Sequence, residues 1–74
     1  MTLNRDQAKY ANDELYNDAV QSEIKAVLCQ DGPMYCGQVA QKVGKSAYET
    51  RWHLTQMKNR AEIGFNWATQ RYNA

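Results

Sequence analysis

The sequence lacks most of the features that mark a secreted, membrane-spanning or disordered chain. Its 74 residues contain one proline and two cysteines, and no apolar run reaches the 18 residues that a bilayer-spanning helix needs. A signal pattern of positive charge followed by an apolar core is also absent from the N-terminus. We therefore expect a soluble, cytoplasmic protein with a single domain over residues 1–74, near the lower size limit for a core without cross-links.

The scarcity of cysteine and histidine narrows the chemistry that the chain can support. Cys29 and Cys36 are the only cysteines and His53 is the only histidine, which falls short of the four ligands of a structural zinc site. We expect both thiols to be free and half-buried. No glycine-rich phosphate loop or nucleophile motif is present, and no second acid or base is spaced to act with His53. The expectation is that the protein is not an enzyme and uses no metal or cofactor.

Charge is unevenly distributed along the chain. Residues 1–37 contain three basic and six acidic residues, a net charge of −3, whereas residues 38–74 contain six basic and two acidic residues, a net charge of +4. Phosphate contacts supply most of the non-specific affinity of proteins for nucleic acid, so a polarised domain would present its basic half to DNA. The plainer alternative is that the charges only solvate two faces.

Hydrophobic periodicity predicts three helices after a polar N-terminal segment over residues 1–13. The first helix, over residues 14–30, has one apolar stripe formed by Tyr16, Val20, Ile24, Val27 and Leu28. Asn12 or Asp13 could cap its start, and Gly32 and Pro33 follow its end. The second helix, over residues 36–43, is expected to bury Val39, Ala40 and Val43. A turn at residues 44–45 leads into a third helix over residues 46–60.

The third helix has two different faces. Ser46 followed by Glu49 is a capping box, in which each side chain accepts a hydrogen bond from a backbone N–H of the first turn. A narrow stripe of Thr50, Leu54, Met57 and Ala61 is expected to face the core, with His53 at its boundary. The opposite face carries Tyr48, Trp52, Thr55 and Asn59, with Arg51 and Lys58 on one flank and Gln56 on the other. Polar and aromatic residues on one exposed face favour a surface that recognises nucleic acid.

The C-terminal residues 62–73 alternate roughly with a period of two and include several β-prone residues, which predicts a short β-hairpin. Ala68 is not a strong hairpin signal, and Phe65, Trp67 and Tyr72 are expected to be hairpin and core residues. A helix, a three-residue turn and a capped helix form the helix-turn-helix arrangement. The expected fold class is mainly α: a three-helix winged helix-turn-helix with a short C-terminal β-wing.

Two runs of the sequence resemble a known family. The segments SEIKAVLCQDG and CGQVAQKVGKSAYETRWHLTQM are similar to the small bacterial fimbrial phase-variation regulators, a winged-helix family. The likeness covers residues 22–63 and is most specific over residues 47–54. It implies DNA binding together with a leucine-responsive global regulator as protein co-regulator, with Tyr48, Arg51 and Trp52 in the DNA-reading segment. Ala61 departs from the family, which usually has glycine before the wing.

We interpret the chain as a sequence-specific, double-stranded DNA-binding transcriptional regulator whose helix over residues 46–60 reads the major groove. The residues expected at this interface are Lys45, Ser46, Tyr48, Arg51, Trp52, Thr55, Lys58 and Arg71. The lysines and Arg71 would contact phosphates. The residues expected to contact bases or sugars are Tyr48, Arg51, Trp52 and Thr55. We also consider a homodimer, since a small DNA reader often needs two half-sites.

A protein-interaction module is the principal alternative. A phage or plasmid factor could use the same fold to dock on host transcription or replication machinery, with exposed Tyr48 and Trp52 as the anchors. Trp52 also has a structural alternative, in which the hairpin folds back and is covered by the indole ring. If the buried stripe faces the core, Arg51 and Trp52 should both be exposed.

Overall fold

The computed structural model describes residues 14–74, so the predictions for residues 1–13 lie outside it. The described chain is mainly helical, with α2 over Glu14–Asp31, α3 over Cys36–Val43 and α4 over Ala47–Asn59. Strands β1 (Gly64–Asn66) and β2 (Arg71–Asn73) pair as a small antiparallel sheet. Each helix begins and ends within one residue of its predicted range. In the described part of the chain, no helix is long and apolar enough to cross a membrane.

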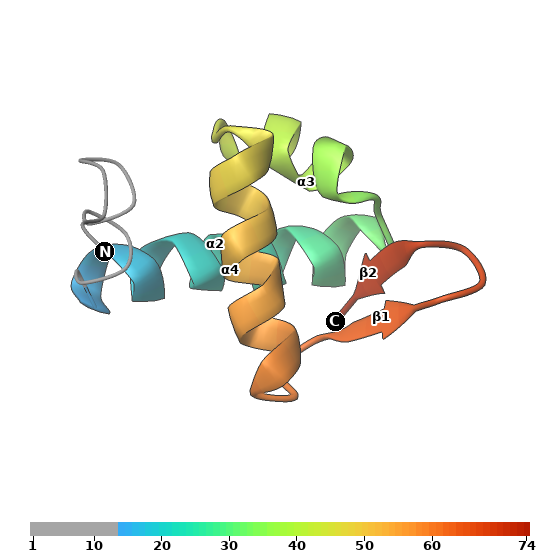
Figure 1. The fold of residues 1–74 in the computed structure, drawn as a ribbon. Helices are drawn as coiled ribbons and strands as arrows, with labels where there is room; N and C mark the ends of the chain where they lie inside the picture. Colours follow the sequence, from blue (N-terminus) through green and yellow to red (C-terminus); the bar gives the residue numbers. More distant parts are fainter. Residues whose placement is uncertain (1–13) are drawn as a thin grey trace, which may run out of the picture.

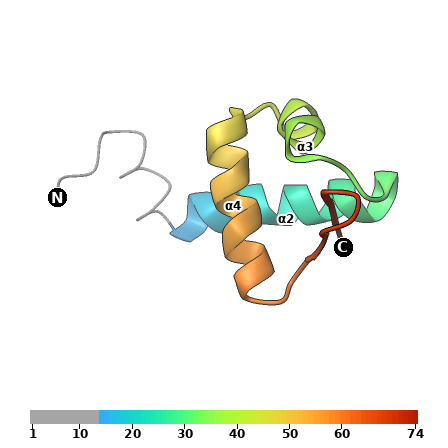
Figure 2. The same ribbon diagram turned by 45° about the vertical axis from the view of Figure 1, so that its right-hand side comes forward.

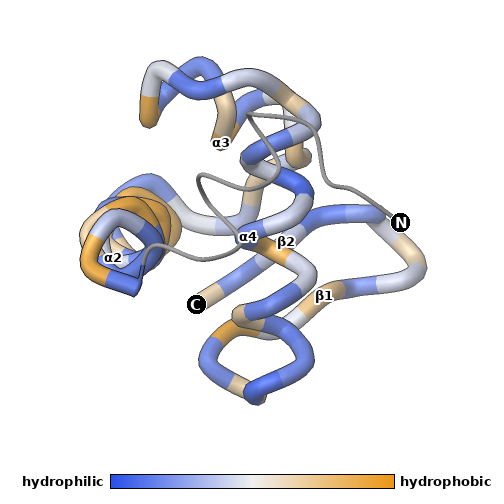
Figure 3. Tube along the Cα trace, turned by 60° about the vertical axis from the view of Figure 1, so that its left-hand side comes forward, coloured by the Kyte–Doolittle hydropathy of each residue, from blue (hydrophilic) through white to orange (hydrophobic). Residues whose placement is uncertain are grey.

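The three helices meet around one core. Figures 1 and 2 both show α4 crossing α2, with α3 beside the start of α4 and the hairpin turned back alongside α4. In Figure 3, where α2 is seen nearly end-on, α3 and α4 lie on the same side of it. The residues buried between these elements are Val20, Ile24, Leu28, Met34, Val39, Val43, Leu54, Met57 and Ile63. The predicted stripes of α2 and α3 are confirmed, except that Tyr16 and Val27 are only half-buried at the edge.

Left-handed residues follow the ends of α2 and α3, as the glycine pattern predicts. Gly32 has a φ of 85° and Gly44 a φ of 68°, a backbone region that glycine enters without a steric cost. The Gly32 N–H donates to the Leu28 carbonyl at 3.0 Å. Both cysteines are free; Cys36 is half-buried as expected, whereas Cys29 is exposed on α2.

The start of α4 confirms half of the predicted capping box. The Ser46 hydroxyl accepts from the Glu49 backbone N–H at 3.1 Å. The reciprocal half is wrong, because the Glu49 carboxylate points to Tyr16 and His53 rather than back to the Ser46 backbone. His53, expected at the boundary of the stripe, is packed within the protein: its side chain is 0% exposed, since the packing of α2 on α4 covers that boundary.

The end of α4 corrects the predicted stripe at Ala61. Thr50, Leu54 and Met57 are buried, but Ala61 is exposed and lies beyond the helix with a φ of 60°. The backbone N–H of Glu62 donates to the Met57 carbonyl at 2.9 Å, and that of Ala61 donates to the Lys58 carbonyl at 3.0 Å. These two bonds form a Schellman motif, and Ala61 occupies its glycine position.

The hairpin forms over the predicted residues, and an asparagine shapes its loop. The register pairs Phe65 with Tyr72 at the centre of the two strands. The Asn66 side-chain oxygen accepts from the backbone N–H of Ala68 at 2.9 Å and of Thr69 at 3.2 Å, an asparagine turn that the sequence analysis missed. Trp67, expected to be a hairpin or core residue, lies in this loop and is 76% exposed, so it belongs to the hairpin and not to the core.

A further pairing, not predicted from the sequence, attaches the hairpin to the helices. Met34, between α2 and α3, forms a β-bridge with Tyr72. The two residues exchange both backbone hydrogen bonds, at 3.0 and 2.8 Å. Because Tyr72 is thus paired on both sides, the hairpin is held close to the start of α3 and beside α4.

Candidate nucleic-acid interface

A groove runs between the start of α3, one flank of α4 and the hairpin. Its lining consists of Tyr35, Cys36, Gly37, Arg51, Thr55, Phe65, Gln70 and Tyr72. The Met34–Tyr72 bridge holds β2 close to the start of α3, so these two sides of the groove stay at a fixed separation. The groove is therefore built from three segments that lie far apart in the sequence, and the cation in its lining is Arg51.

The helix periodicity brings Arg51, Thr55 and Lys58 to one side of α4. Residues separated by four and three positions share a helix face, and this face turns toward the hairpin. Arg51 is exposed, while Thr55 and Lys58 are half-buried. All three residues were predicted at the interface, and the structure brings Arg51 and Thr55 into the lining of the same groove.

Aromatic rings support two of the predicted cations. The Lys58 ammonium lies 5.6 Å from the ring centroid of Phe65 and 5.8 Å from that of Trp67. The Arg71 guanidinium carbon lies 4.9 Å from the ring centroid of Tyr35. At exposed sites such contacts are worth about 0.5–1 kcal/mol, enough to restrain a side chain while leaving its charge available. The cations were predicted from the sequence, but their contacts with Tyr35, Phe65 and Trp67 were not, because no spacing rule joins residues of different elements.

The residues predicted at the start of α4 are distributed over more than one surface. Tyr48 is 60% exposed on the outward face of the first turn, and Ser46 is exposed with its hydroxyl oxygen engaged in the helix cap. Lys45 is half-buried, with its ammonium 5.2 Å from the ring centroid of Tyr16 on α2. Lys45 therefore turns toward α2, whereas Arg51 turns toward the hairpin.

Trp52 does not share the surface of Arg51, so the prediction of one exposed aromatic and basic face is wrong. Consecutive helix residues point about 100° apart, so Trp52 cannot point in the direction of Arg51. It borders a groove that residues of α2 also line. It is half-buried, and its ring meets the His53 ring edge-on with centroids 5.1 Å apart. The groove that Trp52 borders is lined by Glu14, Asn17, Asp18, Gln21, Gln56, Arg60 and Glu62. The lining of this groove thus contains three carboxylates and one guanidinium, and the Trp52 ring packs on that of His53.

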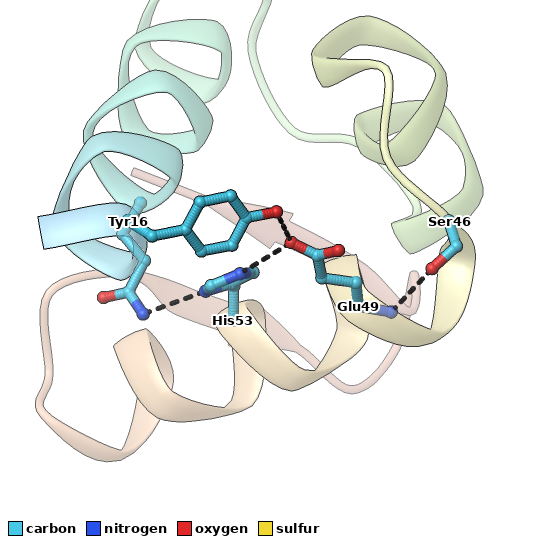
Figure 4. A network of polar contacts seen from close by, with 5 residues as sticks. Tyr16, Ser46, Glu49 and His53 are labelled. Atoms are coloured by element: carbon cyan, nitrogen blue, oxygen red, sulfur yellow. Dashed lines mark hydrogen bonds and ion pairs between the residues drawn. The ribbon is translucent and has the colours of Figure 1, made fainter. Parts of the chain in front are cut away.

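Polar contacts join α2 to α4 beneath this second groove (Figure 4). The Gln21 amide nitrogen lies 3.1 Å from His53 Nδ1, and the Glu49 carboxylate lies 3.4 Å from His53 Nε2. The Tyr16 hydroxyl donates to the same Glu49 oxygen. Burial lowers the pKa of His53 below its ordinary value, against the opposing effect of Glu49. A neutral His53 is therefore one of the buried contacts that fix α4 on α2.

Comparison of the chain with protein-family models, with curated proteins and with solved structures gives no match. The resemblance to fimbrial phase-variation regulators stays a prediction from the residues that carry it. The function must be inferred from the geometry and chemistry of the groove.

Proposed function

We propose that the protein is a sequence-specific double-stranded DNA-binding protein that regulates transcription, built as a winged helix-turn-helix. The observation that carries this proposal is the groove beside α4, which is lined by Arg51 and Thr55 and by two aromatic rings that each hold a further cation, Lys58 over Phe65 and Arg71 over Tyr35. The order α3, tight turn, capped α4 and hairpin supports it further, since this order presents α4 as a recognition helix.

The proposed contacts follow from the chemistry of each side chain. Arginine pairs with both acceptors on the major-groove edge of guanine, and threonine contacts bases through its hydroxyl or methyl group. Arg51 and Thr55 would therefore contact bases, with Tyr48 and Ser46 nearby at the start of α4. Lys58 and Arg71 would contact phosphates on either side. Trp52 and Lys45, which turn toward α2, take no part in this revised interface.

The proposal is tested by fluorescence anisotropy with labelled duplexes, first of mixed sequence and then of a site selected from a random library. Lys58→Ala should weaken binding to every duplex and reduce the salt slope by about one phosphate contact. Arg51→Ala should cost about 1–3 kcal/mol on the selected site and relax the preference for one base pair.

Lys25→Ala is the matched control, because it removes one positive charge from the exposed side of α2, away from the groove. Its affinity for both duplexes should stay close to that of the wild type. Equal losses in Lys25→Ala and Lys58→Ala, or no duplex binding at low salt, would rule out this interface.

A specific observation favours a second candidate function for the opposite flank of α4. Trp52 borders a groove whose lining includes three carboxylates and one guanidinium, so its net charge is negative. Such a surface suits a protein partner better than phosphates, since tryptophan is frequent among interface hot spots. In this case Trp52→Phe should reduce binding of a protein partner without changing the affinity for duplex DNA.

A further inference from the structure

The direction of the hydrogen bonds around His53 is fixed by Arg60. A guanidinium only donates, and Arg60 donates to the side-chain oxygen of Gln21. The amide nitrogen of Gln21 must therefore face His53, where it donates to Nδ1 at 3.1 Å. Because Nδ1 accepts, the proton of the neutral ring lies on Nε2 and points to Glu49 at 3.4 Å.

Protonation of His53 would conflict with this arrangement. A proton on Nδ1 faces the amide NH₂ of Gln21, so two donors meet at 3.1 Å. Rotation of the Gln21 amide would relieve that conflict, but it would turn the NH₂ group toward the Arg60 guanidinium, which is also a donor. One of the two contacts must be lost in either case. Where the amide rotates to keep its contact with His53, the contact that is lost is the one with Arg60, and the proton at His53 then acts on Arg60.

Arg60 lies where the conflict can reach the proposed DNA interface. It follows the last residue of α4, and its guanidinium also donates to Glu62 at 2.9 Å. Residues 60–63 connect α4 to β1, and they determine how the hairpin stands beside α4 (Figure 1). A displaced Arg60 would thus change the position of the hairpin residues relative to Arg51 on α4.

The surroundings of His53 allow it to titrate within the folded protein. The titratable and charged groups near the ring are Glu49 on α4, Tyr16 on α2, Lys45 in the turn before α4, and Arg60 with its partner Glu62. Burial and the charge of Lys45 lower the pKa of His53, whereas Glu49 raises it through its hydrogen bond and charge. An imidazolium would thus keep a carboxylate partner at Nε2 while losing its partner at Nδ1.

We propose that His53 is a proton sensor that positions α4 and the hairpin for DNA binding, with the neutral ring as the binding-competent form. This proposal rests on the proposed function and adds a regulatory input to the same site. His53 is the only histidine in the sequence, and histidine is the side chain whose ordinary titration range covers the pH values near neutrality. The sensor would release DNA as the pH falls.

The decisive measurement is the affinity for a labelled duplex of mixed sequence between pH 7.5 and pH 5.5, at constant ionic strength. We expect the wild type to lose at least about fivefold in affinity, the lower end of usual couplings between two sites, while its circular dichroism spectrum stays folded. In His53→Gln, whose amide offers one acceptor and one donor but cannot titrate, the affinity should be independent of pH. Identical pH profiles of the wild type and the variant would overturn the proposal.

A second measurement needs neither DNA nor a variant, and it tests whether protonation of His53 affects the hairpin. In an NMR titration of the free protein, the ring signals of His53 should shift with the same midpoint as the amide signals of Arg60, Ile63 and the hairpin. Amide signals that do not follow the ring would refute the sensor. A protein that binds no duplex at any pH would instead refute the proposed function, and the titration would still show whether His53 acts on the hairpin.

Discussion

Ala61 adopts a backbone conformation that is costly for any residue with a β-carbon. It has a φ of 60° at the position of the Schellman motif that glycine usually occupies. In this region the β-carbon approaches the following carbonyl oxygen, at a cost of about 1–2 kcal/mol for a residue other than glycine or asparagine. The hydrogen bonds of Ala61 and Glu62 to the last turn of α4 compensate for that strain.

Ala61→Gly should therefore stabilise the protein. We expect a gain of about 0.5–1 kcal/mol in the free energy of unfolding, because the greater freedom of glycine in the unfolded chain offsets part of the relieved strain. Urea unfolding followed by circular dichroism measures this gain. Ala68→Gly is the control, since the described residues other than glycine that have a positive φ are Ala61 and Gln70. If Ala61→Gly is no more stable than Ala68→Gly, the backbone conformation of Ala61 is not strained.

At the scale of the elements, the hairpin is short and depends on its loop. Strands of three residues form few hydrogen bonds, and an isolated two-stranded hairpin is marginal in water. Two contacts compensate: the bridge of Tyr72 to Met34, and the side chain of Asn66 within the loop. The hairpin half of the groove therefore depends on residues that contact no ligand in the proposed interface.

Asn66→Ala should loosen the hairpin while leaving the helices intact. The variant loses the acceptor for the backbone N–H groups of Ala68 and Thr69, which costs about 1 kcal/mol. We expect Cα chemical shifts of residues 64–73 closer to random-coil values, faster hydrogen exchange at Tyr72 and weaker duplex binding. Asn66→Asp keeps the acceptor and should retain the hairpin. If both variants have the shifts of the wild type, the asparagine turn does not hold the loop.

The elements were predictable from the sequence because their signals are local. Periodicity, Gly32, Gly44 and Ser46 mark the helices within one residue, and the alternation of residues 62–73 marks the hairpin. The orientation of side chains depends on contacts between elements, which no local pattern carries. The spacing of Glu49 fits a capping box, but its carboxylate accepts from Tyr16 and contacts His53 instead. A helical wheel places Trp52 toward the solvent, whereas in the structure α2 lies on one side of it.

At the scale of the whole molecule, burial of His53 links stability to pH. The pKa of His53 in the folded state lies below its ordinary value of 6.5, first because of burial. The unfolded chain therefore binds the proton more tightly, and the free energy of unfolding rises with pH over this range. The stability that depends on a neutral His53 is fully present above pH 6.5, and it is lost as the pH falls through the lower pKa of the folded state.

We accordingly expect the urea midpoint to fall between pH 7.5 and pH 5.5. The free energy of unfolding should decrease by about 1.4 kcal/mol for each unit by which the folded-state pKa lies below the unfolded-state pKa within this window. His53→Gln should have a nearly constant midpoint over the same range, because its side chain does not titrate and the carboxyl groups titrate mainly at lower pH. A midpoint that rises on acidification would mean that Glu49 outweighs burial and that the folded state prefers the imidazolium.

The separation of the two tryptophans gives the protein two intrinsic optical reporters. Trp67 stands in the hairpin loop near Lys58, and its indole ring is largely open to water. Trp52 is half-buried at the other flank of α4, with its ring against His53. The emission of Trp67 thus reports on what approaches the hairpin, and that of Trp52 reports on the protonation of the neighbouring imidazole, since an imidazolium quenches indole fluorescence. Replacement of either tryptophan by phenylalanine makes the remaining one a probe of a single surface, without any attached dye.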